Sequence, residues 1–331
     1  EHNQAVCDFH IYNKKLDENW NAERTAEALH ISDRRVRQEL LIKKARDEGV
    51  KEVEEAPKFS SAATFAQRRA ERKKAESVHT VTEMVSGKLA PQLDLTPEEA
   101  VEETSPTEPT RRAKIIQGDF KEWVKQPQKV LYNFVHCDFP YGVNVTKVVQ
   151  SAAKSHGGYD DSAEVYWSLL ETFLTYQDNF IAPQAHIVFW FSMNYFEETK
   201  AKLTEAGWVV NPFPLIWHRA DNKGIIPDTN RYGRRTYETA FFCTRGDRKI
   251  VSPVGISYSG KKTKEYHSSE KPHGMLEHFF RMIIDDSTIM LDPTCGSGMA
   301  VRVAEERGAR FSLGIELNPD YVINAKDNLK L

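Results

Sequence analysis

A carboxylate, a proline and a tyrosine follow directly after an apolar segment in the middle of the chain. Residues 130–137 are apolar and β-prone, which predicts a buried strand, and Asp138-Phe-Pro-Tyr141 stands at its end. In an open parallel sheet, chemistry takes place at the carboxyl ends of the strands. A carboxylate acceptor beside a flat aromatic ring suits a planar substrate that carries an amino group. A turn-capping Asp and a surface Tyr would explain the same residues, so the remainder of the chain has to decide.

A glycine-rich turn near the end of the chain is the second candidate site. Residues 288–292 are a predicted strand, Pro293-Thr-Cys-Gly-Ser-Gly298 is the turn, and a predicted helix follows at 299–307. The next predicted strand, residues 311–316, ends on Glu316. Such a βαβ unit binds a nucleoside, because glycines let the ligand approach the backbone and a carboxylate holds the two ribose hydroxyls.

The details of this turn narrow the choice of nucleoside. A dinucleotide fingerprint would need a third glycine, but Gly296-Ser-Gly298 is followed by Met299-Ala-Val301. A phosphate-binding loop of the GK[ST] type is absent from the sequence. Asp292, just before the turn, can meet a cationic amino group. S-adenosylmethionine, a nucleoside that carries an amino acid, fits these features, whereas a nicotinamide-dependent oxidoreductase would leave Asp138-Phe-Pro-Tyr141 unexplained.

Both motifs resemble those of DNA amino-methyltransferases. Asp138-Phe-Pro-Tyr141 is similar to their [D/N/S]PP[Y/F/W] motif, and Asp292-Pro-Thr-Cys-Gly-Ser-Gly298 is similar to their cofactor motif. The catalytic motif comes first, an order that resembles the β group of these enzymes, which act on adenine N6 or cytosine N4. The resemblance covers residues 111–331. It implies a Rossmann-like α/β methyltransferase fold, circularly permuted, that uses S-adenosyl-L-methionine. A small N-terminal all-α helix-turn-helix region is predicted before it from a separate pattern, described below.

The resemblance assigns site residues by position. The catalytic set is Asp138, Phe139, Pro140 and Tyr141. The set that borders the cofactor is Asp119, Phe120, Asp138, Lys271, Asp292, Pro293, Thr294, Cys295, Gly296, Gly298 and Glu316. In the family, Lys271 matches a residue near the methionine carboxylate, and Asp119 and Phe120 match positions beside the adenine. Phe139 departs from the usual proline, and a phenylalanine leaves φ less fixed than a proline does.

The expected reaction is methylation of the exocyclic amine of a flipped base. Asp138 and a backbone carbonyl of Phe139 or Pro140 would hold the two N–H bonds, and Tyr141 would stack on the base. The sulfonium of the cofactor carries the charge of the leaving group, so the reaction needs no metal. In the family, Asp at the first motif position usually accompanies adenine and Ser accompanies cytosine, which favours adenine N6. Cytosine N4, an RNA or protein acceptor, and a DNA-binding regulator with an inactive methyltransferase domain stay open.

A pair of helices near the N-terminus has the layout of a helix-turn-helix. One predicted helix starts at Asn21, and a second follows Ser32 or Asp33 as its cap. The second helix carries many basic residues, and residues 21–74 resemble the helical DNA-binding part of ParB/KorB-like proteins. An ordinary helical hairpin with a solvated charged face is the alternative to DNA contact. The candidate DNA contacts are Arg34, Arg35 and Arg37 in this helix and Arg231, Arg234 and Arg235 in a later polar loop.

Composition sets the remaining limits. A chain of 331 residues has room for about two domains. We predict a helical region at 1–88, an acidic proline-containing linker at 89–110 and a methyltransferase domain at 111–331. Recognition loops of this second domain are predicted near 142–164 and 219–237. The formal charge of −3 restricts nucleic-acid attraction to local basic surfaces. The four cysteines form no CxxC pair, which fits a reducing compartment.

These limits also bear on location and partners. Neither a signal peptide nor an apolar run of about 18 residues is present, so no membrane contact is expected. We expect a cytoplasmic protein, encoded by a bacterium or by a phage in a bacterial host, with double-stranded DNA as its partner. The resemblance adds a homodimer and a cognate restriction enzyme as further partners to consider.

Overall fold

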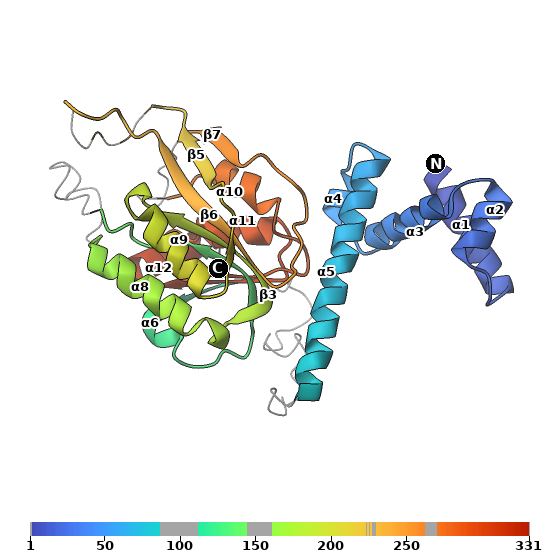
Figure 1. The fold of residues 1–331 in the computed structure, drawn as a ribbon, viewed down its shortest axis with the longest axis horizontal. Helices are drawn as coiled ribbons and strands as arrows, with labels where there is room; N and C mark the ends of the chain where they lie inside the picture. Colours follow the sequence, from blue (N-terminus) through green and yellow to red (C-terminus); the bar gives the residue numbers. More distant parts are fainter. Residues whose placement is uncertain are drawn as a thin grey trace. The chain divides into compact units, whose positions relative to one another are not determined.

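The computed structural model describes residues 2–86, 112–143, 161–222, 224, 226, 230–261 and 270–330 (Figure 1). The chain divides into two compact units, Glu1–Val78 with Lys249–Ser252 and His79–Arg248 with Pro253–Leu331. The predicted linker at 89–110 lies outside the described residues, so the predicted domain boundaries stay predictions. Among the described residues, no helix is both long enough and apolar enough to cross a membrane.

The N-terminal unit is helical. Its helices are α1 (His2–Leu16), α2 (Ala22–Leu29), α3 (Asp33–Asp47), α4 (Lys51–Glu54) and α5 (Phe59–Ser86). Asn21 caps α2 by accepting a hydrogen bond from the backbone N–H of Arg24, and Ser32 caps α3 in the same way. Both starts agree with the sequence prediction. Val36 of α3 is fully buried and packs with Val6 and Ala26, which joins α1, α2 and α3 around one small core.

The second unit is built on a nine-stranded mixed sheet. Its strands are β1 (Ala113–Gln117), β2 (Tyr132–Cys137), β3 (Ile181–Phe191), β4 (Val209–Val210), β5 (Leu215–Arg219), β6 (Tyr237–Arg245), β7 (Ser257–Gly260), β8 (Ile289–Asp292) and β9 (Phe311–Glu316). The strand order is β1-β9-β8-β2-β3-β6-β5-β7, and β4 also pairs with β6. Strands β1, β9, β8, β2 and β3 are parallel neighbours, whereas β6 runs antiparallel to β3 and β5.

A long hairpin flanks the polar loop, and its first arm has one interruption. Its first arm consists of two strands, β4 and β5, which both pair antiparallel with β6. Asn211 separates them, because its side chain accepts a hydrogen bond from the backbone N–H of Phe213 and so forms a turn. The hairpin loop is described in part, at residues 220–222, 224 and 226 and again from Asn230.

Helices cover both faces of the sheet. They are α6 (Phe120–Trp123), α8 (Ala163–Thr175), α9 (Phe196–Glu205), α10 (His273–Phe280), α11 (Met299–Glu306) and α12 (Pro319–Leu329), with short 3-10 turns at Gln177–Asn179 and Met193–Tyr195. Helices α8 and α9 lie over one face, and α10 and α11 lie over the other (Figure 1). This three-layer arrangement confirms the prediction of a doubly wound α/β fold.

Strand β2 runs through the centre of this unit, and all six of its residues are buried. Val135 and Cys137 pack in the core beneath α8. The rings of Phe134 and His136 point to the other face and meet Phe280 of α10, with ring centroids 5.1 and 5.6 Å apart. Because both faces of β2 are covered, its carboxyl end is held rigidly, and Asp138 follows at once.

Candidate active site

Four neighbouring parallel strands each lead into a carboxylate at the same edge of the sheet. In spatial order, β1 leads to Asp119, β9 ends on Glu316, β8 ends on Asp292, and β2 leads to Asp138. These residues lie far apart in the chain, and the parallel pairing brings them to one edge. The four predicted site carboxylates therefore lie next to one another along the same edge of the sheet.

The glycine-rich turn after β8 is shaped by close packing. Gly296 and Gly298 have φ values of +52° and +72°, in the left-handed region that glycine tolerates. A Cβ atom on Gly298 would lie 2.8 Å from Leu329 Cδ1 and 3.1 Å from Ala325 Cβ of α12, so this position disfavours a side chain both by its φ and by its crowding. A Cβ atom on Gly296 would meet no protein atom within 4 Å, which leaves open space beside this turn.

Glu316 faces the same turn. One of its carboxylate oxygens accepts the backbone N–H of Gly296 at 2.9 Å, and the other accepts that of Asn318 at 2.8 Å. Burial raises the pKa of Glu316 and the nearby Asp292 adds to this effect, while the two backbone donors oppose it. The side chain is thus a fixed acceptor at the end of β9.

Asp292 is held from two sides. Its Oδ1 atom accepts the backbone N–H of Thr294 at 3.2 Å, and its Oδ2 atom lies 2.9 Å from Nδ1 of the buried His136. The Trp190 indole N–H donates to Nε2 of the same ring at 3.0 Å. Because Nε2 accepts, the neutral ring carries its proton on Nδ1 and donates to Asp292. His136 therefore orients the carboxylate that precedes the glycine-rich turn.

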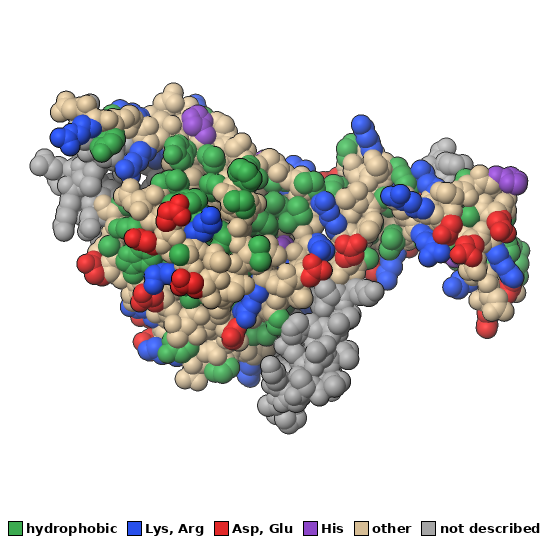
Figure 2. Space-filling model, in the orientation of Figure 1, with side chains coloured by type: hydrophobic (Ala, Val, Ile, Leu, Met, Phe, Trp, Pro, Cys, Tyr) green, Lys and Arg blue, Asp and Glu red, His purple; other side chains and the backbone are tan. Residues whose placement is uncertain are grey.

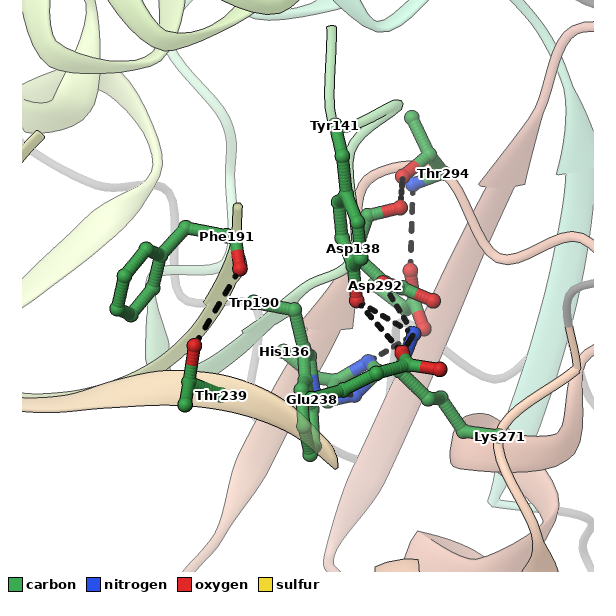
Figure 3. A network of polar contacts seen from close by, with 10 residues as sticks. All are labelled: His136, Asp138, Tyr141, Trp190, Phe191, Glu238, Thr239, Lys271, Asp292 and Thr294. Carbon is green, nitrogen blue, oxygen red and sulfur yellow. Dashed lines mark hydrogen bonds and ion pairs between the residues drawn. The ribbon is translucent and has the colours of Figure 1, made fainter. Parts of the chain in front are cut away.

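Lys271 points into the centre of the catalytic motif (Figure 3). Its Nζ atom donates to Asp138 Oδ1 at 2.6 Å and to the Tyr141 hydroxyl at 2.9 Å, and it lies 3.3 Å from Glu238 Oε2. The Tyr141 hydroxyl in turn donates to Glu238 Oε2 at 3.0 Å. Burial lowers the pKa of Lys271, but the carboxylates of Asp138 and Glu238 outweigh burial and raise it overall. The side chain is therefore a buried cation shared between two carboxylates.

The catalytic turn and the glycine-rich turn are joined directly. The Thr294 hydroxyl donates to the backbone carbonyl of Asp138 at 3.3 Å, although the two residues are 156 positions apart. On its other side, the backbone N–H of Gly142 donates to Asp161 at 2.8 Å. The predicted amine acceptor is thus placed beside the predicted cofactor turn by contacts within the protein.

Two aromatic residues of the predicted site belong to the core. Phe139 is 1% exposed and its ring lies 5.9 Å from Phe120 and 5.6 Å from Phe189. Phe120 is itself 3% exposed and also packs on Phe180. The departure from proline at position 139 thus fills space beneath α8. The predicted contact between Phe120 and the adenine stays a prediction, since the structure places this ring in the core.

Three residues of this network were missed by the sequence analysis. His136 had a usable signal, because it is, with Asn133, one of two polar residues in a mostly apolar strand and stands two positions before Asp138. Trp190 and Glu238 had none, since they come from β3 and β6 and reach the site only through sheet pairing.

The predicted DNA-contacting arginines are divided between two settings. Arg231, Arg234 and Arg235 are exposed in the hairpin loop, while residues 144–160 of the other predicted loop lie outside the described residues. In the N-terminal unit, Arg34 is exposed. Arg35 instead pairs with the buried Glu39 and stacks on Phe59, and Arg37 pairs with Asp33 at 2.9 Å. In Figure 2, acidic side chains are interleaved with basic ones over the helices of this unit.

Comparison with known proteins agrees with this geometry. The family model described as DNA methylase (N6_N4_Mtase) matches residues 132–327. YubD of Escherichia coli (strain K12) is 28% identical over 121 residues, and the type II methyltransferase M1.MboII of Moraxella bovis is 29% identical over 111 residues. These matches cover 35% and 32% of this chain, and they span 51% and 40% of the lengths of those relatives.

A solved structure has the same fold. The M1.HpyAVI–SAM complex superposes with a TM-score of 0.52 at 19% identity, over 66% of this chain and 100% of that chain. This likeness confirms the prediction of a Rossmann-like methyltransferase fold. Because the family model matches more than half of the residues, and does so across the strands that carry Asp138, Asp292 and Glu316, the chain belongs to the DNA methylase family.

Proposed function

We propose that the protein transfers a methyl group from S-adenosylmethionine to the exocyclic amine of a base flipped out of duplex DNA, and that the base is adenine. The observation that carries the proposal is the direct contact between the two turns, in which Thr294 donates to the Asp138 carbonyl. This contact supports the proposal because it joins the turn of the proposed amine acceptor to the turn of the proposed cofactor site.

The residues at the sheet edge fit the cofactor. When bound, S-adenosylmethionine supplies a methyl group on a positively charged sulfonium and carries an ammonium group as well. Among the described residues, this part of the sheet edge holds the carboxylates of Asp138, Glu238, Asp292 and Glu316 together with the ammonium of Lys271. An excess of negative charge favours a cationic ligand. The open space beside Gly296 leaves room for a ligand at the backbone, and Glu316, which faces the same turn, would accept from ribose hydroxyls.

The catalytic turn provides the groups that handle the target base. An exocyclic amine is a poor nucleophile, because its lone pair is delocalised into the ring. Asp138 would accept one of its N–H bonds, and the carbonyl of Phe139 or Pro140 would accept the other, so that the nitrogen becomes more pyramidal. Tyr141 would stack on the flipped base. Holding the amine in place in this way supplies much of the rate acceleration.

The choice of adenine N6 over cytosine N4 rests on Asp138 at the first position of the motif, the residue that usually accompanies adenine in the family. The permuted order is supported by the chain order of β2 before β8. A homodimer, a restriction partner and a cytoplasmic location remain predictions of the resemblance.

We extend the proposal to the N-terminal unit, where α3 would add contacts to DNA phosphates. Its side chains Arg34, Lys44 and Arg46 are exposed and have no ion-pair partner within the described residues. They differ from Arg35 and Arg37, which are paired within the helix. Because phosphate contacts depend steeply on salt, replacing the three exposed residues with alanine should weaken DNA binding and flatten its salt dependence.

The function is tested by methyl transfer from labelled S-adenosylmethionine to mixed-sequence duplex DNA, followed by mass spectrometry of the nucleosides. N6-methyladenine that disappears in the Asp138→Ala variant would support the proposal. N4-methylcytosine would keep the mechanism and change the base. Cofactor binding without labelled DNA would instead support an inactive regulator or an acceptor in RNA or protein.

A further inference from the structure

Glu238 is a carboxylate that the sequence motifs do not include, yet it meets both functional groups of the catalytic turn. It stands at the start of β6, opposite Trp217 of β5. Its Oε2 atom accepts the Tyr141 hydroxyl at 3.0 Å and lies 3.3 Å from Lys271 Nζ. Its side chain is 21% exposed and points toward Lys271 and Tyr141 (Figure 3).

Lys271 raises a difficulty for the amine acceptor. Its ammonium lies 2.6 Å from Asp138 Oδ1 and is 6% exposed. An ion pair between these two groups alone would have no net charge, and one oxygen of Asp138 would already be bound to a strong donor. The target amine becomes positively charged as its bond to the methyl group forms. A neutral pair would do little to stabilise that charge.

Glu238 changes this charge balance. Asp138, Glu238 and Lys271, in their ionised forms, carry one net negative charge. The ammonium is shared between two carboxylates, and its surroundings are closed by the rings of Tyr141 and Trp190, whose centroids lie 5.1 and 5.0 Å from Nζ. In such a water-poor setting, a fixed charge acts more strongly than it would in solvent.

Glu238 also fixes the ring of Tyr141. The hydroxyl donates to Glu238 and accepts from Lys271, so both of its hydrogen-bonding functions are in use. A ring held at its far end presents its face in one direction. Since a flipped base would stack on this face, the hydroxyl contact bears on how the base is aligned.

We infer that Glu238 is a positioning residue of the transfer reaction, which shares the ammonium of Lys271 with Asp138, supplies the net negative charge that the reacting amine needs, and anchors Tyr141. The inference rests on the proposed function. It assigns a role to a residue of the antiparallel part of the sheet, far in sequence from both motifs.

Three variants separate the roles of Glu238. Glu238→Gln keeps an acceptor for Tyr141 and removes the charge, Glu238→Ala removes both, and Glu238→Asp keeps the charge on a shorter side chain. The matched control is Glu277→Gln, because Glu277 of α10 is a partly exposed carboxylate paired with Arg307 at 2.6 Å and lies outside the network. For each variant, kcat, the KM for DNA, the Kd of S-adenosylmethionine and the thermal midpoint are measured.

We expect Glu238→Gln to lower kcat by about 10- to 100-fold, less than the 10²–10³-fold typical of removing a group that directly stabilises the developing charge. Its KM for DNA should stay within about threefold of wild type, since the hydrogen bond to Tyr141 is retained. Glu238→Ala should additionally raise KM, and Glu238→Asp should recover part of kcat. The control should match wild type in kcat and KM.

Two results would overturn the inference. One is a kcat of Glu238→Gln within about threefold of wild type, and the other is a loss of kcat in Glu238→Gln that Glu238→Asp does not relieve at all. If the Glu238 variants fail to fold, Tyr141→Phe tests the anchor alone, and an unchanged KM for DNA would refute it. If the wild-type protein itself transfers no methyl group, the proposed function is refuted. The wild-type sample in the same assay distinguishes this result from a failure of the role assigned to Glu238.

Discussion

Replacing His136 with phenylalanine should expose how strongly the site depends on a buried histidine. The ring donates to Asp292 at 2.9 Å and accepts from the Trp190 indole at 3.0 Å, and the residue is 2% exposed. Phenylalanine has a similar shape and can still pack on Phe280, but it has no polar atom. The change therefore isolates the two hydrogen bonds from the packing.

The magnitude follows from the two partners left behind. A buried group that loses its only partner costs about 1–3 kcal/mol, and a charged group costs more. Trp190 would lose an acceptor and the Asp292 carboxylate would lose its side-chain donor, so we expect about 3–5 kcal/mol of lost stability. The matched control is Phe134→Leu, on the same face of β2 and also against Phe280, where only packing changes and roughly 1 kcal/mol is expected.

Urea unfolding of both variants measures these values, since a lower midpoint with an unchanged slope reports a change in stability. Calorimetric titration of S-adenosylmethionine adds a second measure. We expect the Kd to rise at least about tenfold in His136→Phe, because Asp292 is no longer held in one orientation. A variant as stable as Phe134→Leu that binds the cofactor like wild type would refute the role assigned to His136.

Three further predictions concern the core, the ribose site and the N-terminal unit. Phe139→Pro restores the usual family residue but empties a packed site, so it should lower the free energy of unfolding by about 2–4 kcal/mol in urea titrations. We expect no gain in kcat from this change. Burial raises the pKa of Glu316 above its ordinary value of 4.5. The protonated side chain therefore stabilises the folded state below pH 4.5, and this stabilisation is lost as the pH rises through the raised pKa. Cofactor affinity should show the opposite trend and fall on acidification through the raised pKa, and Glu316→Gln should flatten this dependence in titrations at several pH values. Hydrogen bonds from Lys73 and Arg69 lower the pKa of Glu48, so the stabilisation that this carboxylate gives is lost as the pH falls through the lowered pKa. Glu48→Gln should therefore lower the free energy of unfolding by roughly 1 kcal/mol, which faster hydrogen exchange in α5 would report.

The parts of the site that the sequence revealed are those encoded by local patterns. Asp138 follows a run of apolar residues, and Gly296 and Gly298 stand in a short turn between a predicted strand and a predicted helix. Each feature depends on neighbours within a few positions, so a reader of the sequence can find it. The doubly wound sheet follows in the same way from alternating strand and helix patterns.

The parts that the sequence concealed depend on tertiary pairing. Glu238 accepts a hydrogen bond from Tyr141, which lies 97 positions away in the chain. No sequence pattern near either residue predicts this hydrogen bond. Phe139 looked like a change in the catalytic motif, but its ring belongs to the core. Arg35 looked like a DNA contact, whereas its stacking on Phe59, 3.5 Å from the ring centroid, serves the packing of α3 against α5. Charge type alone does not tell whether a basic side chain faces solvent or a neighbouring helix.

The spatial order of the strands explains why the chain order of the motifs matters little to the chemistry. Strand β8, which carries the cofactor turn, is inserted directly beside β2, which carries the catalytic turn, although more than 150 residues separate Asp138 from Asp292 along the chain. Parallel pairing aligns the carboxyl ends of neighbours whatever segments connect them. The contact from Thr294 to Asp138 needs only that β8 and β2 be adjacent. A chain that presented these strands in the opposite sequence order would build the same edge, provided that its connections kept the order β9-β8-β2-β3. The site therefore requires that β8 and β2 be neighbours in the sheet, whatever their order in the chain. The long connection from β2 to β8 contains β6, which brings Glu238 to the other side of the proposed catalytic turn.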